Sequence, residues 1–146
     1  MIRPNRRDSQ IPLSDYHALS EFRYRVRQFL RITERTARQA RVNPQQHRLM
    51  LAVKGMPAGM APSISNLAER LQLESHSTVE LVNRAVGRGL VARATDRHDR
   101  RVVLVRVTPR GERLLEQLSR RNREQLRAAA PALMRALRAL TRERSA

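Results

Sequence analysis

The sequence predicts a mainly α-helical (α+β) protein with one short β-hairpin. Apolar residues recur at steps of three and four along two long segments, 14–40 and 109–144, which is the spacing of one face of a helix. Shorter segments between them carry capping residues followed by helical patterns. A run of branched apolar residues, 102–107, follows the charged loop TDRHDRR (95–101), and a second short segment that is expected to be extended, 90–94, precedes it. Two such segments joined by a short polar loop are typical of a hairpin.

The composition limits the classes of protein that fit. The 146 residues suit one domain with helical extensions. The chain has no cysteine, which excludes disulfides and thiolate chemistry. The polar start, MIRPNRRDSQIPLSD, does not resemble a signal peptide, and no apolar run is long enough to span a bilayer, so we expect a cytoplasmic protein without a membrane partner. The formal net charge of +17 predicts a polyanionic partner.

The first long helix is expected at 14–40, after a flexible basic tail at 1–13. Its apolar stripe consists of Leu19, Phe22, Val26, Phe29, Leu30, Thr33 and Ala37. So long a stripe needs more partner surface than one small domain offers, which predicts packing against further helices. A second helix is expected at 45–54, with Asn43 as its cap and Pro44 at its first position.

A pair of short helices follows the Gly- and Pro-containing loop at 55–62. Ser63 is expected to cap the helix ISNLAERL (64–71), and a break at 72–74 leads to a fourth helix at 75–88, which Gly89 ends. Two helices joined by a tight turn, here 63–88, are typical of the helix-turn-helix motif. The second helix of that motif enters the major groove of DNA.

The predicted fourth helix has two different faces when residues are placed at about 100° per residue. The arc expected to pack inward contains Thr78, Val79, Leu81, Val82, Ala85 and Val86. The outer arc contains His76, Ser77, Glu80, Asn83, Arg84, Gly87 and Arg88. A solvated helix face has the same pattern, but here a hairpin with a basic tip follows directly. The helix-turn-helix and the hairpin at 90–107 together predict a winged helix.

The hairpin tip fits the minor groove of DNA, where narrow A·T-rich stretches attract arginine. Arg97, Arg100 and Arg101 are the candidates for that contact. Phosphate would repel Asp99, so we expect Asp99 to form an ion pair that fixes the direction of an arginine. Arg93 and Arg106 stand at strand positions, from which they could reach flanking phosphates. The alternative is a charged tip that only keeps the surface soluble.

The C-terminal segment is expected to form two helices. Thr108 caps the fifth, with Pro109 in its first turn, and its apolar residues are Leu114, Leu115, Leu118 and Leu126. Pro131 is expected to begin the sixth, whose apolar residues are Leu133, Met134, Leu137 and Leu140.

These segments resemble the MarR (multiple-antibiotic-resistance regulator) family of winged helix-turn-helix transcription factors. Residues 63–115 carry the resemblance, which extends more weakly over 14–146. Its most specific part is DRRVVLVRVT (99–108), similar to the family's wing signature of Asp, any residue and Arg before an apolar strand and Thr. The resemblance implies that Asp99 orients Arg101, and that the helices at 14–40 and 109–144 form a dimer interface. Gln72 stands where many members have glycine in the turn.

The full set of candidate DNA-binding residues joins the helix and the hairpin tip. It comprises Ser75, His76, Ser77, Thr78, Glu80, Asn83, Arg84, Arg97, Asp99, Arg100 and Arg101. Glu80 puts a negative charge on this face. It could accept a hydrogen bond from a cytosine amino group or pair with Arg84 four residues further on.

The resemblance implies a homodimeric repressor that binds palindromic double-stranded DNA and is released by a small aromatic or anionic effector. Tyr24, His47 and nearby arginines are candidates for an anion pocket, although spacing alone does not bring them together. Two other functions stay open, namely a sequence-tolerant architectural DNA-binding protein and an RNA-binding accessory protein. Aromatic residues make up only 3% of the chain, which argues against single-stranded RNA.

No enzyme active site, metal site or cofactor is expected. The four histidines, His17, His47, His76 and His98, stand on separate predicted elements, and no pair has metal-ligand spacing. The sequence also lacks a phosphate-binding glycine loop and a Gly-x-Ser-x-Gly nucleophile motif.

Overall fold

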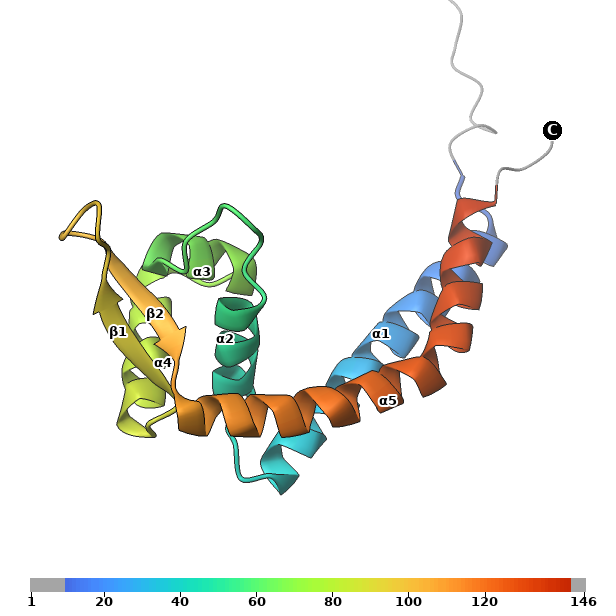
Figure 1. Ribbon diagram of the computed structural model, residues 1–146. Coiled ribbons are helices and arrows are strands. Elements are labelled where there is room, and N and C mark those ends of the chain that lie inside the picture. The colour runs from blue at the N-terminus through green and yellow to red at the C-terminus, as the bar shows by residue number, and fades with distance from the viewer. Residues whose placement is uncertain (1–9, 143–146) are drawn as a thin grey trace, which may run out of the picture. The chain divides into compact units, whose positions relative to one another are not determined.

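The computed structural model describes residues 10–142, and in this part of the chain it is mainly helical with one two-stranded sheet (Figure 1). The elements in chain order are α1 (Leu13–Gln39), α2 (Pro44–Lys54), α3 (Ile64–Leu71), α4 (Ser75–Gly87), β1 (Val91–Thr95), β2 (Val103–Val107) and α5 (Pro109–Thr141). The predicted fold class is therefore confirmed. Most of the basic tail predicted at 1–13, and the last residues of the helix predicted to reach 144, lie outside the described residues.

Three side-chain caps fix the starts of the helices, and all three were predicted. Oδ1 of Asn43 accepts the backbone N–H of Gln45 at 2.8 Å before α2. Oγ of Ser63 accepts the N–H of Asn66 at 3.2 Å before α3. Oγ1 of Thr108 accepts the N–H of Gly111 at 3.1 Å before α5. Each cap satisfies an amide that has no partner within its own helix.

The prediction of a separate sixth helix beginning at Pro131 is wrong. α5 continues from Pro109 to Thr141 with Pro131 inside it. Proline removes one backbone hydrogen bond and costs a helix interior about 3 kcal/mol. The flanking segments, RAAA before and ALMRAL after, consist of strong helix formers. Their propensity and their place in one packed helix offset the cost, so the proline does not interrupt α5.

The chain divides into two compact units. The central unit is Thr33–Asn122, and the described parts of the terminal unit are residues 10–32 and 123–142. In the central unit α2, α3 and α4 contact one another, and the sheet contacts all three. The core of this unit consists of Val42, Leu49, Met50, Val53, Leu67, Leu81, Val82, Ala85, Leu90, Val91, Val105, Leu115 and Leu118. Helix-turn-helix, hairpin and the start of α5 thus share one hydrophobic core.

The sheet is an antiparallel hairpin with its register running from Val91 opposite Val107 to Thr95 opposite Val103. The segment before α3 extends it, because Ser63 pairs with Leu104 and the N–H of Val105 donates to the carbonyl of Pro62 at 3.0 Å. β2 is therefore hydrogen-bonded on both sides near its middle. This pairing attaches the hairpin to the helix-turn-helix.

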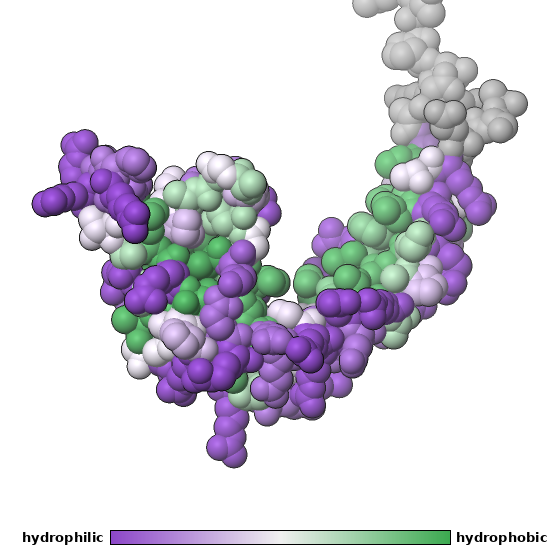
Figure 2. All heavy atoms as spheres, viewed as in Figure 1, coloured by the Kyte–Doolittle hydropathy of each residue, from purple (hydrophilic) through white to green (hydrophobic). Residues whose placement is uncertain are grey.

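In the terminal unit, large apolar side chains of α1 and α5 remain exposed to solvent, and Figure 2 shows hydrophobic residues on the surface of this unit. They are Leu13, Tyr16, Leu19, Tyr24 and Leu30 on α1, and Leu126, Met134 and Leu137 on α5. Ala136 is buried in this unit. No helix within residues 10–142 combines the length and the apolarity needed to cross a membrane.

Candidate nucleic-acid interface

A tight turn with a left-handed residue joins α3 to α4. Gln72 adopts φ 56° and ψ 46°, and its N–H is directed at the carbonyls of Ala68 and Glu69. Its side-chain Nε2 also donates to the carbonyl of Glu69 at 2.8 Å, and the N–H of Leu73 donates to Ala68 at 2.9 Å. Glycine is the usual residue in this conformation. Here the amide side chain of Gln72 adds a hydrogen bond to the turn.

α4 buries one face against the central core and exposes the other. Thr78, Leu81, Val82 and Ala85 are buried. Of the predicted contact residues, Ser75, His76, Glu80, Asn83 and Arg84 are exposed and Ser77 is half-buried. The exposed face thus offers hydroxyl, imidazole, carboxylate, amide and guanidinium groups. Groups of these kinds can read base edges in a major groove.

The burial of two neighbouring residues on α4, Thr78 and Val79, changes the candidate interface. Thr78 was a candidate for DNA contact, but its side chain is fully buried, and its hydroxyl donates to the carbonyl of Glu74 at 2.9 Å. Val79 was expected to pack inward, but it is 40% exposed. The buried residues span an arc of about 100°, and Val79 lies about 60° beyond its edge at Val82. Thr78 therefore leaves the candidate interface and Val79 joins it.

The acidic residue on the exposed face of α4 pairs within the helix. Nη2 of Arg84 lies 3.6 Å from Oε2 of Glu80, and both side chains are more than half exposed. This is the second of the two arrangements considered from the sequence. An exposed pair of this kind contributes little to stability, so either side chain can turn towards a ligand at low cost.

The loop between β1 and β2 orders its charged residues through two aspartates. Oδ1 of Asp96 accepts the N–H of His98 at 2.8 Å. Oδ1 of Asp99 accepts two hydrogen bonds from Arg101, one from the backbone N–H at 3.0 Å and one from Nε at 3.2 Å. The ion pair predicted for Asp99 is therefore present, and Arg101 is the arginine that it holds.

We call the hairpin at 90–107 the wing. Its arginines extend into solvent from this loop, which Figure 2 shows as a hydrophilic projection. The Arg101 side chain is 91% exposed although Asp99 holds it. Arg97 and Arg100 are also exposed, and neither forms an ion pair with another described residue. Their charges are therefore available to a polyanion. Arg93 and Arg106 are exposed on the two strands, as expected.

The base of the wing is attached to the end of α4. Gly89 adopts φ 71°, and the N–H groups of Gly89 and Leu90 donate to the carbonyls of Val86 and Ala85. Oγ1 of Thr108 donates to the carbonyl of Gly89 at 2.5 Å, which joins the end of β2 to the same turn. β1 contacts α4 along the sheet (Figure 1). The wing and the exposed face of α4 are therefore parts of one packed unit.

Comparison with known proteins supports this reading of the central unit. The model of the MarR family matches residues 42–102, which include α2, the helix-turn-helix, β1 and the wing loop. A relative from Bacillus subtilis, the HTH-type transcriptional regulator YsmB, is 34% identical over 65 residues. That match spans 44% of this chain and 44% of the length of the relative.

Solved structures share the fold over more of the chain. A mutant of MepR from S. aureus, bound to an oligodeoxyribonucleotide, superposes with a TM-score of 0.61 at 16% identity, covering 75% of this chain and 79% of that one. CouR from Rhodococcus jostii, bound to p-coumaroyl-CoA, gives a TM-score of 0.59 at 22% identity, with 68% of each chain covered. At sequence identities as low as these, the structural similarity shows that the fold is shared and nothing further.

The family match covers the helix-turn-helix, β1 and the loop that follows it, and the MepR structure shares the fold over 75% of this chain. Over residues 42–102 this chain is similar to the MarR family, whose members are transcription regulators.

Proposed function

We propose that the protein is a DNA-binding transcriptional regulator that places α4 in a major groove and the wing in the adjacent minor groove of one duplex. The pairing of Asp99 with the exposed Arg101 carries this proposal. A basic loop that only kept the surface soluble would not need an acid that holds one arginine in place. The fold shared with a MepR mutant bound to an oligodeoxyribonucleotide gives further support.

In this arrangement the two surfaces have different tasks. Base edges would be read by α4, through Ser75, His76, Ser77, Val79, Glu80, Asn83 and Arg84. Arg97, Arg100 and Arg101 would enter the minor groove, with Asp99 positioning Arg101. The net charge of +17 would supply much of the affinity through phosphate contacts, which release counterions and make binding fall steeply with salt.

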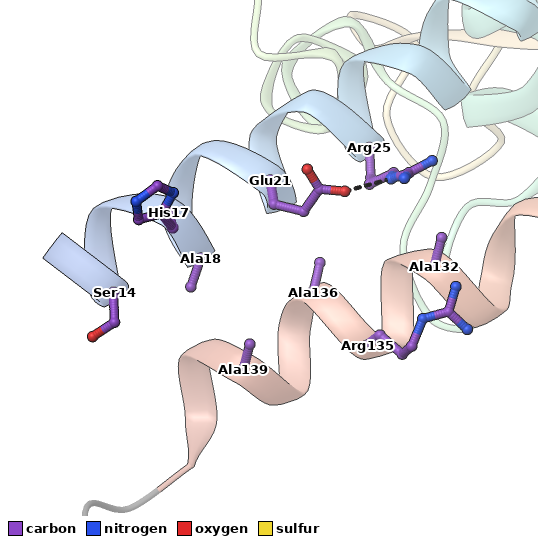
Figure 3. A pocket seen from close by; sticks show the side chains of 9 residues that line it. All are labelled: Ser14, His17, Ala18, Glu21, Arg25, Ala132, Arg135, Ala136 and Ala139. Atoms are coloured by element: carbon purple, nitrogen blue, oxygen red, sulfur yellow. Dashed lines mark hydrogen bonds and ion pairs between the residues drawn. The ribbon is translucent and has the colours of Figure 1, made fainter.

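The protein would bind DNA as a homodimer formed by the helices at 14–40 and 109–144. The exposed apolar side chains of the terminal unit need a partner surface, and a second copy supplies an equal one. A groove of about 400 Å³ lies between α1 and α5 of this unit, lined on the α5 side by Ala132, Ala136 and Ala139, whose side chains point towards α1 (Figure 3). Such small side chains in the groove would allow a helix of the second copy to approach closely.

The pair of α4 helices in such a dimer would reach successive major grooves, ~34 Å apart on one side of the duplex. The operator would then be palindromic. We further propose that the protein represses transcription in the cytoplasm and is released by a small aromatic or anionic effector. CouR, which shares the fold, is bound to p-coumaroyl-CoA in its structure.

Selection of bound duplexes from a random pool, followed by sequencing, tests the proposal. A dimeric regulator should enrich one palindrome, preferred over random DNA by ~10³-fold or more. An architectural protein would enrich no sequence, and an RNA-binding protein would be displaced from the duplex by RNA. Sedimentation equilibrium tests the dimer separately, because a monomer has a mass of 16.9 kDa.

A further inference from the structure

A cleft of about 480 Å³ lies between α2 and α3 within the central unit. Its lining residues are Arg48, Leu51, Ala52, Gly55, Arg70 and Leu71. Its volume falls within the range of roughly 300–1,000 Å³ that is usual for sites of small molecules. A smaller hollow lined by Gln45, Arg48, Leu71, Leu73 and Leu81 adjoins it, since both include Arg48 and Leu71.

The lining combines apolar surface with uncompensated positive charge. Leu51 is 49% exposed, although it is a large apolar residue, and Leu71 is half-buried beside it. Arg48 and Arg70 are exposed, and neither forms an ion pair with another residue in the described part of the chain. Lys54, the other cation of α2, is already paired with Glu112 at 2.8 Å. The two arginines therefore keep their capacity to bind an anion.

We propose that this cleft binds a small amphipathic carboxylate. The carboxylate would pair with the guanidinium groups of Arg48 and Arg70, whose planar donor groups match carboxylate geometry. The apolar body would cover Leu51, Ala52 and Leu71, removing their exposed surface from water. A hydrophilic anion such as phosphate would satisfy the arginines but leave the leucines exposed.

The position of the cleft connects it to the turn of the helix-turn-helix. Leu71 is the last residue of α3, the left-handed Gln72 follows it, and the adjoining hollow reaches Leu81 on α4. A ligand that filled the cleft would therefore bias the packing of α3 against α2, and with it the direction of α4. This consequence for DNA binding rests on the proposed function, whereas binding of the ligand rests on the cleft alone.

Isothermal titration calorimetry of the full chain tests the site with octanoate and 4-butylbenzoate as probes. At least one of them should bind with one site per chain. Octanamide, which keeps the apolar body, and inorganic phosphate, which keeps the negative charge, should each bind at least about tenfold more weakly. If neither carboxylate binds at millimolar concentration, or if phosphate binds as well as they do, the proposal is overturned.

Three variants with the same change of charge localise the binding. Arg48→Gln and Arg70→Gln should each weaken the carboxylate by about tenfold. Arg113→Gln, an exposed arginine on α5 that does not line the cleft, should leave it unchanged. Because all three side chains are exposed, the variants should fold, and thermal melts check this. An equal loss in Arg113→Gln would show that binding depends only on net charge and would overturn the site.

Binding of the selected duplex, measured with and without saturating carboxylate, separates the two proposals. A change in duplex affinity that disappears in Arg48→Gln supports the coupling. No change in affinity would overturn the coupling while leaving the cleft as a site. Carboxylate binding by a protein that binds no DNA would support the cleft and contradict the proposed function.

Discussion

Asp99 holds Arg101 through one oxygen atom, because Oδ1 of Asp99 accepts both the backbone N–H and Nε of Arg101. The acid thus fixes the loop backbone and the start of the guanidinium group together, while the tip of Arg101 stays in solvent. Removal of the Asp99 carboxylate should therefore change DNA affinity in opposite directions in two cases. Affinity should rise if binding depends only on charge, and it should fall if binding depends on a positioned Arg101.

We expect Arg101→Ala to weaken binding of the selected duplex by about tenfold or more, since an arginine inserted in a groove contributes roughly 1–3 kcal/mol. Asp99→Ala should also weaken binding, although it removes a negative charge from a DNA-facing loop. Asp99→Asn, which keeps an acceptor oxygen, should fall in between. Fluorescence anisotropy titrations at fixed salt measure these affinities, with Arg113→Ala as the control for loss of one charge. Tighter binding by Asp99→Ala would show that Asp99 does not position Arg101.

Thr78 and Val79 provide a second test, on the helix. Val79→Ala should alter the base preference of the selected duplexes at one position, because an exposed valine can contact a thymine methyl group. Its thermal stability should be unchanged or slightly higher. Thr78→Val should keep the base preference and lose about 1 kcal/mol of stability, through loss of the hydrogen bond to Glu74. Duplex selection and thermal melts of both variants check this, and an altered preference in Thr78→Val would contradict the burial of that residue.

Gly111 marks the closest approach between α5 and the base of the wing. A Cβ atom there would lie 2.1 Å from the backbone oxygen of Leu90 and 2.8 Å from Cγ1 of Val107. Gly111→Ala should therefore destabilise the protein by about 1–3 kcal/mol or more, since backbone must move. Gly87, in α4, has nothing within 4 Å of its Cβ position, and Gly87→Ala should stabilise by about 0.5–1 kcal/mol.

Urea denaturation followed by circular dichroism measures both glycine variants. The opposite signs of the two changes are the critical result. If Gly111→Ala unfolded at the same urea concentration as the unmodified protein, the close contact between α5 and Leu90 would not exist in solution.

Burial of His47 makes stability depend on pH. The side chain is 5% exposed, and its Nε2 has no hydrogen-bond partner among the described residues. Burial, and secondly the positive charge of Arg48, lower the pKa of His47 below its ordinary value. The unfolded state therefore binds a proton at a higher pH than the folded state does. Stability associated with neutral His47 is present at pH 7 and above, and is lost as the pH falls below about 6.5 towards the lowered pKa.

The comparison of interest is the free energy of unfolding of the unmodified protein relative to His47→Gln between pH 8 and pH 5. As the pH falls, the free energy of unfolding of the unmodified protein should decrease relative to that of His47→Gln, by at most about 1.4 kcal/mol per pH unit for one proton. The difference should level off once both states are protonated. A difference that stayed constant over this range would show that His47 is not buried in its neutral form.

Most of the local structure could be predicted from the sequence, because it depends on residues a few positions apart. The caps at Asn43, Ser63 and Thr108 each join a side chain to an amide two or three residues later. The pair of Asp99 and Arg101 spans two residues, and the pair of Glu80 and Arg84 spans one helical turn. Pro131 is the exception, since the helix-forming residues around it override the rule that a proline ends a helix.

Only the tertiary structure decided which side chains are available to a ligand. Thr78 is buried, as the helical wheel predicted, but Val79 is exposed, because α3 and the sheet cover only one side of α4 and a wheel does not contain the direction of those neighbours. The cleft of Arg48 and Arg70 joins residues of α2 and α3 that no spacing rule connects, whereas His47, a sequence candidate for an anion pocket, turns into the core. The sequence determined the helices, the hairpin and the charges because these follow from short-range geometry. Burial and cavities depend on segments distant along the chain, and those meet only when the core packs.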